Sequence, residues 1–267
     1  MNDIKTGSET KETAVEIKDL RMSYGKKLIQ ENINFQVAKG SIFIIMGGSG
    51  CGKSTLLKHM IGLLPPAAGQ VLYGETDYWA AEVEKQDEIR RHFGVLFQGS
   101  ALFSTLTLTE NVTMPMKLNG DAKKSDAERR DRAHELLDMV SLSHAKDLLP
   151  NEISGGMKKR AALARALALD PEFLFLDEPS AGLDPISSRK LDDLILELRD
   201  RTRATVLVVT HELPSLFAIG DDGIFLDAQS KQPIARGAPK ALLETCEHPF
   251  VQAFLNREVP DGDESNE

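Results

Sequence analysis

A glycine-rich stretch directly follows a short apolar run, and its residue types suit the binding of phosphate. The apolar run is Ile42–Met46, and the stretch reads Gly47-Gly48-Ser49-Gly50-Cys51-Gly52-Lys53-Ser54-Thr55. Glycines let the backbone approach an anion closely, and a helix that starts near Lys53 would point its N–H groups at the phosphate. Lys53 supplies a charge for the β- and γ-phosphates, and the Ser54 hydroxyl can ligate Mg²⁺. The complete Gly-x-x-x-x-Gly-Lys-Ser pattern after a strand favours a nucleotide site over an ordinary glycine turn.

Two carboxylates follow a second apolar run. The run Phe173–Leu176 predicts a buried strand, and Asp177 and Glu178 come directly after it. In a wound nucleotide-binding sheet, ligands bind at the carboxyl ends of the strands. Asp177 would then hold Mg²⁺, usually through water, and Glu178 would polarise a water aimed at the γ-phosphate. On its own such a pair is as often an ordinary loop, but behind a phosphate loop the functional interpretation is favoured.

A second candidate anion site begins at Ser154. The residues Ser154-Gly155-Gly156 place a hydroxyl and two glycines at the start of a predicted helix. One ATP needs a single phosphate cradle, so the second would serve the ATP of another copy across a two-fold interface. The alternative is that Ser154 is simply the N-cap of its helix.

Length and composition set the class of protein. The chain has 267 residues, of which 41% are hydrophobic and 27% charged, enough for one α/β domain with an inserted subdomain. The net charge of −9 argues against a nucleic-acid partner. We find no apolar stretch of membrane-spanning length and no signal-peptide pattern near Met1. These observations predict a cytosolic protein, or one that is held on the cytosolic side of a membrane by its partners. Two cysteines are too few to predict a disulfide framework or a metal site.

Hydrophobic patterns indicate the order of the elements. Val15–Ile17 and Ile33–Val37 alternate apolar and polar residues, as half-exposed antiparallel strands do. Ile42–Met46, Phe173–Leu176 and Val206–Val209 are continuous apolar runs, typical of parallel strands buried on both faces. We expect a flexible leader over residues 1–13, one domain over residues 14–258 with a helical subdomain inserted at about 99–166, and an acidic tail over residues 259–267.

Three helices are predicted in the middle of the chain. Ser125–Glu128 has the pattern of a capping box, and the helix after it carries an apolar stripe. The stripe consists of Ala133, Leu136, Leu137 and Val140. A second helix is expected over residues 155–169, ended by Asp170-Pro171, and a third from Pro185.

Taken together, these motifs resemble those of the ATP-binding subunits of ABC transporters, over about residues 15–256. The resemblance implies an ABC-type P-loop domain in the α/β class. Such a domain has a RecA-like core with a parallel sheet, an antiparallel β flank and an inserted α-helical subdomain. It also implies an ATPase that uses ATP and Mg²⁺. Two such domains sandwich two ATPs head to tail and separate after hydrolysis.

The resemblance carries a role to each matching position. Tyr24 matches the aromatic residue that stacks on adenine, and Gln98 the glutamine that senses the γ-phosphate and Mg²⁺. Asp184 lies in the loop that crosses the dimer interface, and His211 matches the switch histidine. The implied catalytic residues are Lys53, Gln98, Glu178 and His211, and the implied metal ligands are Ser54, Gln98 and Asp177. The implied nucleotide-binding residues are Tyr24, Gly47–Thr55, Gln98, Ser154, Gly155, Gly156, Asp177, Asp184 and His211.

Met157 stands where the signature motif usually has Gln, and Ile153 where it has Leu. Ser-Gly-Gly-Met followed by a basic pair, the loop Leu96–Phe103 and the tail His248–Leu255 resemble the ATPases of Mla/Mce-type lipid transporters. That subfamily implies a homodimer with integral membrane permease subunits, a lipid-binding Mce-type protein and a small accessory subunit. The location would be peripheral, on the cytoplasmic face of the inner membrane, and the cargo phospholipid or another hydrophobic lipid.

Two alternatives stay open for the function as a whole. One is the ATPase of an importer for another small solute, and the other is a soluble ABC ATPase that does not serve transport. The second class usually carries two nucleotide domains or long coiled-coil or basic insertions, and this acidic chain has none of them.

Two smaller hypotheses also follow from the residues. The apolar Leu102, Phe103 and Leu106 either dock a membrane partner or pack the subdomain's own core. Cys51 lies in an anion-binding loop beside a helix N-terminus, where a thiolate is favoured, so a thiol reagent would inhibit. The alternative is an inert side chain that points away from the nucleotide.

Overall fold

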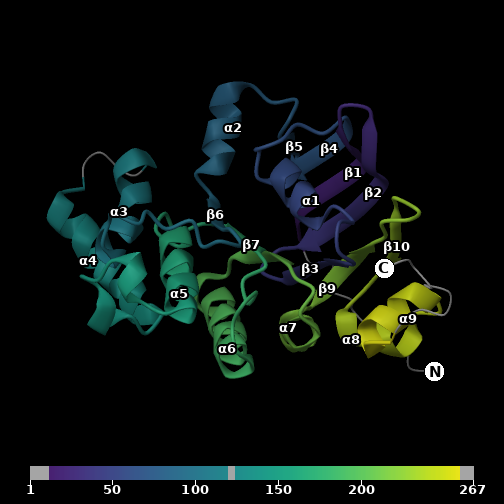
Figure 1. Cartoon of the computed structure of the whole chain (residues 1–267). Coiled ribbons are helices and arrows are strands. Elements are labelled where there is room, and N and C mark those ends of the chain that lie inside the picture. The colour runs from purple at the N-terminus through teal and green to yellow at the C-terminus, as the bar shows by residue number, and fades with distance from the viewer. Residues whose placement is uncertain (1–11, 120–123, 259–267) are drawn as a thin grey trace, which may run out of the picture.

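Two β-sheets and the helices packed on them make up the protein (Figure 1). The computed structural model describes residues 12–119 and 124–258. The strands are β1 Thr13–Tyr24, β2 Lys27–Ala38, β3 Ile42–Gly47, β4 Ala68–Tyr73, β5 Thr76–Asp77, β6 Phe93–Leu96, β7 Phe173–Asp177, β8 Thr205–Val209, β9 Asp222–Leu226 and β10 Pro233–Arg236. The helices are α1 Lys53–Met60, α2 Val83–Arg90, α3 Leu108–Asn119, α4 Asp126–Met139, α5 Gly155–Ala166, α6 Pro185–Thr202, α7 Leu213–Ile219, α8 Pro239–Thr245 and α9 Pro249–Asn256, with 3-10 turns η1 Ser143–Ala145 and η2 Pro150–Glu152.

The larger sheet has the strand order β10-β9-β3-β8-β7-β6, and all neighbours are parallel except β10 and β9. Every residue of β3 is buried, because the strand has a hydrophobic layer on each face. Phe43 and Ile45 belong to one layer, whereas Ile42, Ile44 and Met46 belong to the other. This alternation explains why the parallel strands are continuous apolar runs, as the sequence predicted.

The smaller sheet is antiparallel, in the order β2-β1-β4-β5, and forms the predicted flank. Helix α1 contacts β3, β7 and β8 of the larger sheet. Its Leu56 and Leu57 share a core with Val15 and Ile17 of β1, so the helix lies between the two sheets. The phosphate loop that precedes α1 is thereby fixed at both of its ends.

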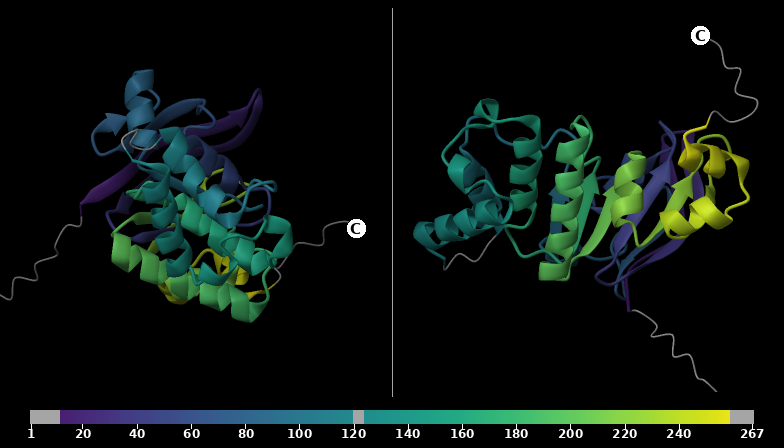
Figure 2. Two further views of the ribbon diagram at one scale, coloured as in Figure 1. Left: turned by 90° about the vertical axis from the view of Figure 1, so that its left-hand side faces the viewer. Right: turned by 90° about the horizontal axis from the view of Figure 1, so that it is seen from below.

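A helical unit is inserted between β6 and β7, which pair directly with each other. It contains α3, α4 and α5 and projects from one end of the molecule, opposite α8 and α9 (Figure 2). The predicted capping box is confirmed: Ser125 Oγ accepts from the Glu128 N–H at 3.2 Å, and the Glu128 carboxylate accepts from the Ser125 N–H at 2.6 Å. The stripe on α4 is buried, as expected.

The end of α5 and the end of the expected leader differ from the prediction, and the expected tail lies beyond the described residues. Helix α5 ends at Ala166 and not at Leu169. Leu167 and Ala168 are buried although they lie outside the helix, so their apolar character did not indicate that the helix continued. Asp170, before Pro171, has a φ of +51°. Of the expected leader, residues 1–11 lie outside the described part, and Thr13 already belongs to β1; the expected tail lies wholly outside it. In the described ranges, no helix combines the length and apolar character needed to cross a membrane.

Candidate nucleotide site

Parallel strands bring the predicted site residues to one edge of the larger sheet. Strand β3 ends at Gly47 and β7 at Asp177, while Gln98 follows β6 and His211 follows β8. Because these strands run in the same direction, their carboxyl ends meet at a common edge. Motifs that are separated by up to 164 residues in the sequence, from 47 to 211, therefore lie together at this edge of the sheet.

The phosphate loop adopts a backbone that requires glycine. Gly47 has a φ of +140°, and a Cβ at this position would come within 2.3 Å of the Leu226 carbonyl oxygen. Gly52 has a φ of +101° and is the N-cap of α1. The Lys53 Nζ donates to the carbonyl oxygens of Gly47 at 2.8 Å and of Gly48 at 2.9 Å, so the loop curves around this ammonium group.

A cavity of about 550 Å³ lies over this loop. Its lining includes Gly47–Gly50, Gly52–Thr55, Gln98, Glu178 and His211, together with two side chains that sequence analysis did not predict, Ile29 and Phe254. The volume is in the range of small-molecule sites. The glycine backbone, the lysine and the start of α1 fit a phosphate group.

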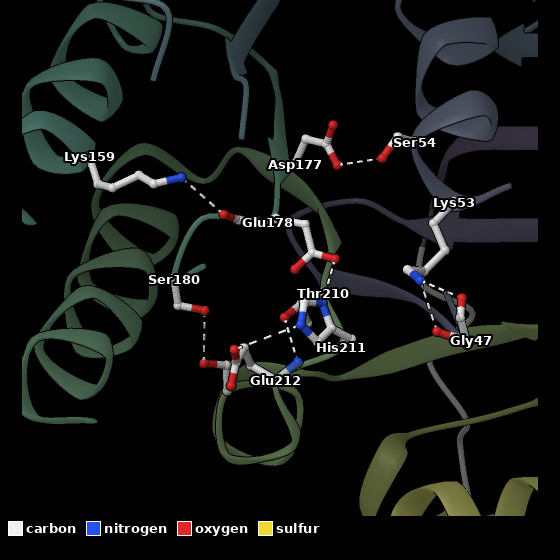
Figure 3. A network of polar contacts seen from close by, with 12 residues as sticks. Gly47, Lys53, Ser54, Lys159, Asp177, Glu178, Ser180, Thr210, His211 and Glu212 are labelled. Atoms are coloured by element: carbon white, nitrogen blue, oxygen red, sulfur yellow. Dashed lines mark hydrogen bonds and ion pairs between the residues drawn. The ribbon is translucent and has the colours of Figure 1, made fainter. Parts of the chain in front are cut away.

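Ser54, which lines this cavity, contacts Asp177 at the end of β7. The Ser54 hydroxyl donates to Asp177 Oδ1 at 2.9 Å (Figure 3). A hydroxyl and a carboxylate are hard oxygen donors, which is the ligand chemistry that Mg²⁺ prefers. The two side chains therefore fit a Mg²⁺ ion at this point.

Glu178 has an unusual conformation. Its φ is +49°, which is rare outside glycine, and its N–H donates to the Val209 carbonyl at 2.9 Å. The His211 Nδ1–H donates to Glu178 Oε1 at 2.8 Å (Figure 3). Glu178 is 7% exposed, and its Oε2 has no hydrogen-bond partner within the described residues. One carboxylate oxygen is therefore fixed by the histidine and the other is available as an acceptor.

The second predicted anion site is elsewhere on the chain. Ser154 is the N-cap of α5, and its Oγ accepts from the Met157 N–H at 3.3 Å. Ser154 and Gly156 line a separate cavity of about 490 Å³ together with Leu183. The fold of one chain thus does not bring the two phosphate sites together, which is the arrangement expected if each serves a different copy.

Asp184 and Tyr24 are the most peripheral of the predicted site residues. Asp184 is the N-cap of α6 and accepts from the N–H groups of Ile186 and Ser187 at 3.0 Å. The hydrogen bond from the Ser187 hydroxyl, with those from the backbone, lowers the pKa of Asp184. Tyr24, at the end of β1, is 48% exposed and is not among the described residues that line the nucleotide cavity.

The structure corrects the thiolate hypothesis for Cys51. The side chain is buried, and a Cβ at Gly47 would approach its Sγ to 2.7 Å, so the sulfur lies beneath the loop. Burial raises the pKa of the thiol despite the opposing charge of Lys53. The alternative of an inert side chain is therefore the better description, although the Cys51 backbone remains part of the loop.

Comparison with known proteins decides the family. Residues 30–181 match the family model of the ABC transporter. The chain belongs to the ABC transporter family. The expected ABC cassette fold and the ATPase class are thereby confirmed.

Several named transport proteins are similar to this chain in sequence or structure. It is 38% identical to the intermembrane phospholipid transport system ATP-binding protein MlaF of Haemophilus influenzae, over 91% of this chain and 90% of the relative. It is also 38% identical to the probable ribonucleotide transport ATP-binding protein mkl of Mycobacterium leprae, over 91% of this chain and 69% of that protein. The dimeric structure of MJ0796, a bacterial ABC transporter cassette, superposes with a TM-score of 0.76 at 32% identity, over 83% of this chain and 97% of that one.

Proposed function

We propose that this ABC ATPase energises a transporter of the Mla/Mce type that moves phospholipid or another hydrophobic lipid. The observation that carries the ATPase part is the convergence of the phosphate loop, the Ser54–Asp177 pair and the Glu178–His211 pair at one edge of the sheet. The lipid cargo is supported by the named relative MlaF and by the signature sequence that ends in Met157.

Nucleotide binding falls to the loop and to the residues around it. The backbone N–H groups of residues 47–55 and the Lys53 ammonium would hold the phosphates, and Tyr24 would stack on the adenine. Ser54, Asp177 and Gln98 would hold Mg²⁺, which when bound neutralises phosphate charge. The Ser54–Asp177 hydrogen bond of 2.9 Å already places two of these oxygen donors side by side.

Hydrolysis requires a base that is oriented toward the attacking water. Glu178 Oε2 is buried and without a partner in the described part of the chain, so it is available to accept a proton from water. His211 fixes the other oxygen and thereby the direction of the carboxylate. The positive φ of Glu178 is a strained backbone conformation, and such strain is typical of functional positions.

A second copy would complete each nucleotide site. Ser154, Gly155 and Gly156 at the start of α5 would contact the γ-phosphate held by the other copy, and the loop with Asp184 would cross the interface. Support comes from the exposed position of Ser154, which is absent from the lining of the chain's own nucleotide cavity, and from the dimeric form of the similar cassette MJ0796.

The partners follow from the transport role. We infer a homodimer bound to integral membrane permease subunits at the cytoplasmic face of the inner membrane, with a Mce-type lipid-binding protein and a small accessory subunit. Phe103, in the loop after Gln98, is 51% exposed, and it is a candidate contact for a permease. Leu102 and Leu106 are half-buried, which fits a contribution to the subdomain's own core. With a net charge of −9, nucleic acid is not proposed as a partner.

Affinity purification of the tagged full-length chain from membranes tests the proposal. We expect a multi-spanning permease to co-purify, and phospholipid to be detected in the complex by mass spectrometry. The similarity to mkl favours a second candidate, a transporter of ribonucleotides, in which case nucleotide transport and no bound lipid would be found. Recovery without any membrane protein would contradict both and support a soluble ABC ATPase.

A further inference from the structure

A buried lysine on α5 contacts the two segments that carry Gln98 and Glu178. Lys159 is only 5% exposed. Its Nζ donates to the carbonyl oxygen of Gln98. It also donates to the carbonyl oxygen of Glu178 at 3.1 Å (Figure 3). These two acceptors lie 61 and 19 residues away in the chain, so a single ammonium group links three separate segments.

Burying the ammonium group of Lys159 costs free energy, because the charge loses its hydration. Burial lowers the pKa of Lys159, and the negative charges of Asp177 and Glu178 oppose this effect. A methionine of similar length would fill the same space without the desolvation cost of an amine. A lysine at this position has a physical explanation in the two carbonyl groups that its N–H groups hold in place.

Both contacted segments have strained backbones that need outside support. Glu178 has a φ of +49°; its N–H is bonded to Val209 and its carbonyl to Lys159. Beyond Gln98, Ser100 and Ala101 also have positive φ, and Arg165 of α5 donates to their carbonyls at 2.9 and 2.6 Å. Helix α5 therefore holds the Gln98 loop through two basic side chains, of which only Lys159 also reaches Glu178 within the described contacts.

We propose that Lys159 is a positioning residue for ATP hydrolysis, which fixes Gln98 and Glu178 relative to the signature helix α5. The inference rests on the proposed ATPase mechanism and extends it. Lys159 lies just over one turn after Ser154 on α5, so a shift of the Gln98 loop or of Glu178 in one nucleotide site is transmitted to the residues that serve the other copy's site. Lys159 is not a catalytic residue, since among the described residues its side chain donates hydrogen bonds only to backbone carbonyls.

Lys159→Met in the full-length chain, and in the membrane complex that co-purifies with it, tests this inference. Steady-state phosphate release gives kcat and KM, and calorimetry gives the affinity for MgATP. We expect kcat to fall about 10- to 100-fold, the effect of a misplaced catalytic group, while the affinity for MgATP changes little. Lys159→Arg keeps the charge and the donors and should restore most of the rate. Lys158→Met removes the neighbouring, partly exposed charge on the same helix and should leave kcat unchanged.

A purely structural lysine would give a different pattern. Lys159→Met would then lower the melting temperature and the yield, but the folded fraction would hydrolyse ATP with the wild-type kcat, and this result would overturn the inference. If Lys159→Met does not fold, Lys159→Gln, whose amide keeps two N–H donors, is measured in the same way. A wild-type chain and complex that hydrolyse no ATP would contradict the proposed function itself, whereas an active wild type with an equally active Lys159→Met contradicts only the role of Lys159.

Discussion

A buried carboxylate near the catalytic loops provides a quantitative test of the packing around the site. Asp192 on α6 is 2% exposed. Its Oδ2 accepts from the Ser215 hydroxyl on α7 at 2.9 Å, and its Oδ1 has no partner in the described structure. Ser215 Oγ also lies 3.4 Å from Ser180 Oγ, just after Glu178. Burial raises the pKa of Asp192 from 3.8 to about 6; the Ser215 hydrogen bond and the Arg189 charge oppose this rise, and the charges of Asp193 and Glu212 add to it.

The raised pKa determines the sign and size of the effect. Between about pH 4 and about pH 6 the folded state keeps a proton that the unfolded state has lost, so stability falls as pH rises through this window and stays lower above it. A shift of about two units corresponds to at most about 3 kcal/mol. Asn at position 192 cannot ionise, so Asp192→Asn should be more stable than the wild type by about 1–3 kcal/mol at about pH 7.5, with the difference shrinking toward about pH 4.5.

Urea unfolding followed by Trp79 fluorescence between about pH 5 and pH 8 measures this difference. The matched control is Asp193→Asn, because Asp193 is exposed and pairs with Arg189 at 3.0 Å. That variant should change the free energy of unfolding by less than about 1 kcal/mol at any of these pH values. The reasoning is refuted if Asp192→Asn is less stable than the wild type at about pH 7.5, or if its effect does not depend on pH.

Two further predictions concern the nucleotide site. Glu178→Gln should lower turnover about 10²- to 10⁴-fold and leave MgATP binding intact, since Oε2 loses its basicity; near wild-type phosphate release from this variant would remove Glu178 from the role of base. Cys51 should react slowly with a thiol reagent in the folded protein, and ATP should not alter the rate, because its sulfur lies beneath the loop. Rapid labelling that ATP prevents, accompanied by loss of hydrolysis, would restore the thiolate hypothesis.

The sequence predicts those features that depend on neighbouring residues. The capping box of Ser125 and Glu128, the phosphate loop and the buried parallel strands all depend on contacts within a few residues or on a simple burial pattern. The edge that gathers Gly47, Asp177 and His211 was also predictable, since parallel strands end together.

Other features depend on contacts between distant segments and escaped prediction. Lys159 reaches a carbonyl 61 residues away, and Phe254 of α9 lines a cavity built mainly from the phosphate loop and the start of α1. The environment of Cys51 also depends on packing between distant segments: its position beside a helix N-terminus suggested a thiolate, but the structure buries the side chain and favours the inert alternative. The end of α5 was placed too late because Leu167 and Ala168 are apolar for packing rather than for helix formation.

Calorimetric titration of MgATP into the purified full-length chain tests the central claim most directly. The account predicts saturable uptake of about one nucleotide per chain, and a large loss of affinity in Lys53→Ala, because that ammonium group curves the loop around itself through the carbonyls of Gly47 and Gly48. Absence of any MgATP binding by the wild type, or equal binding by Lys53→Ala, would contradict it.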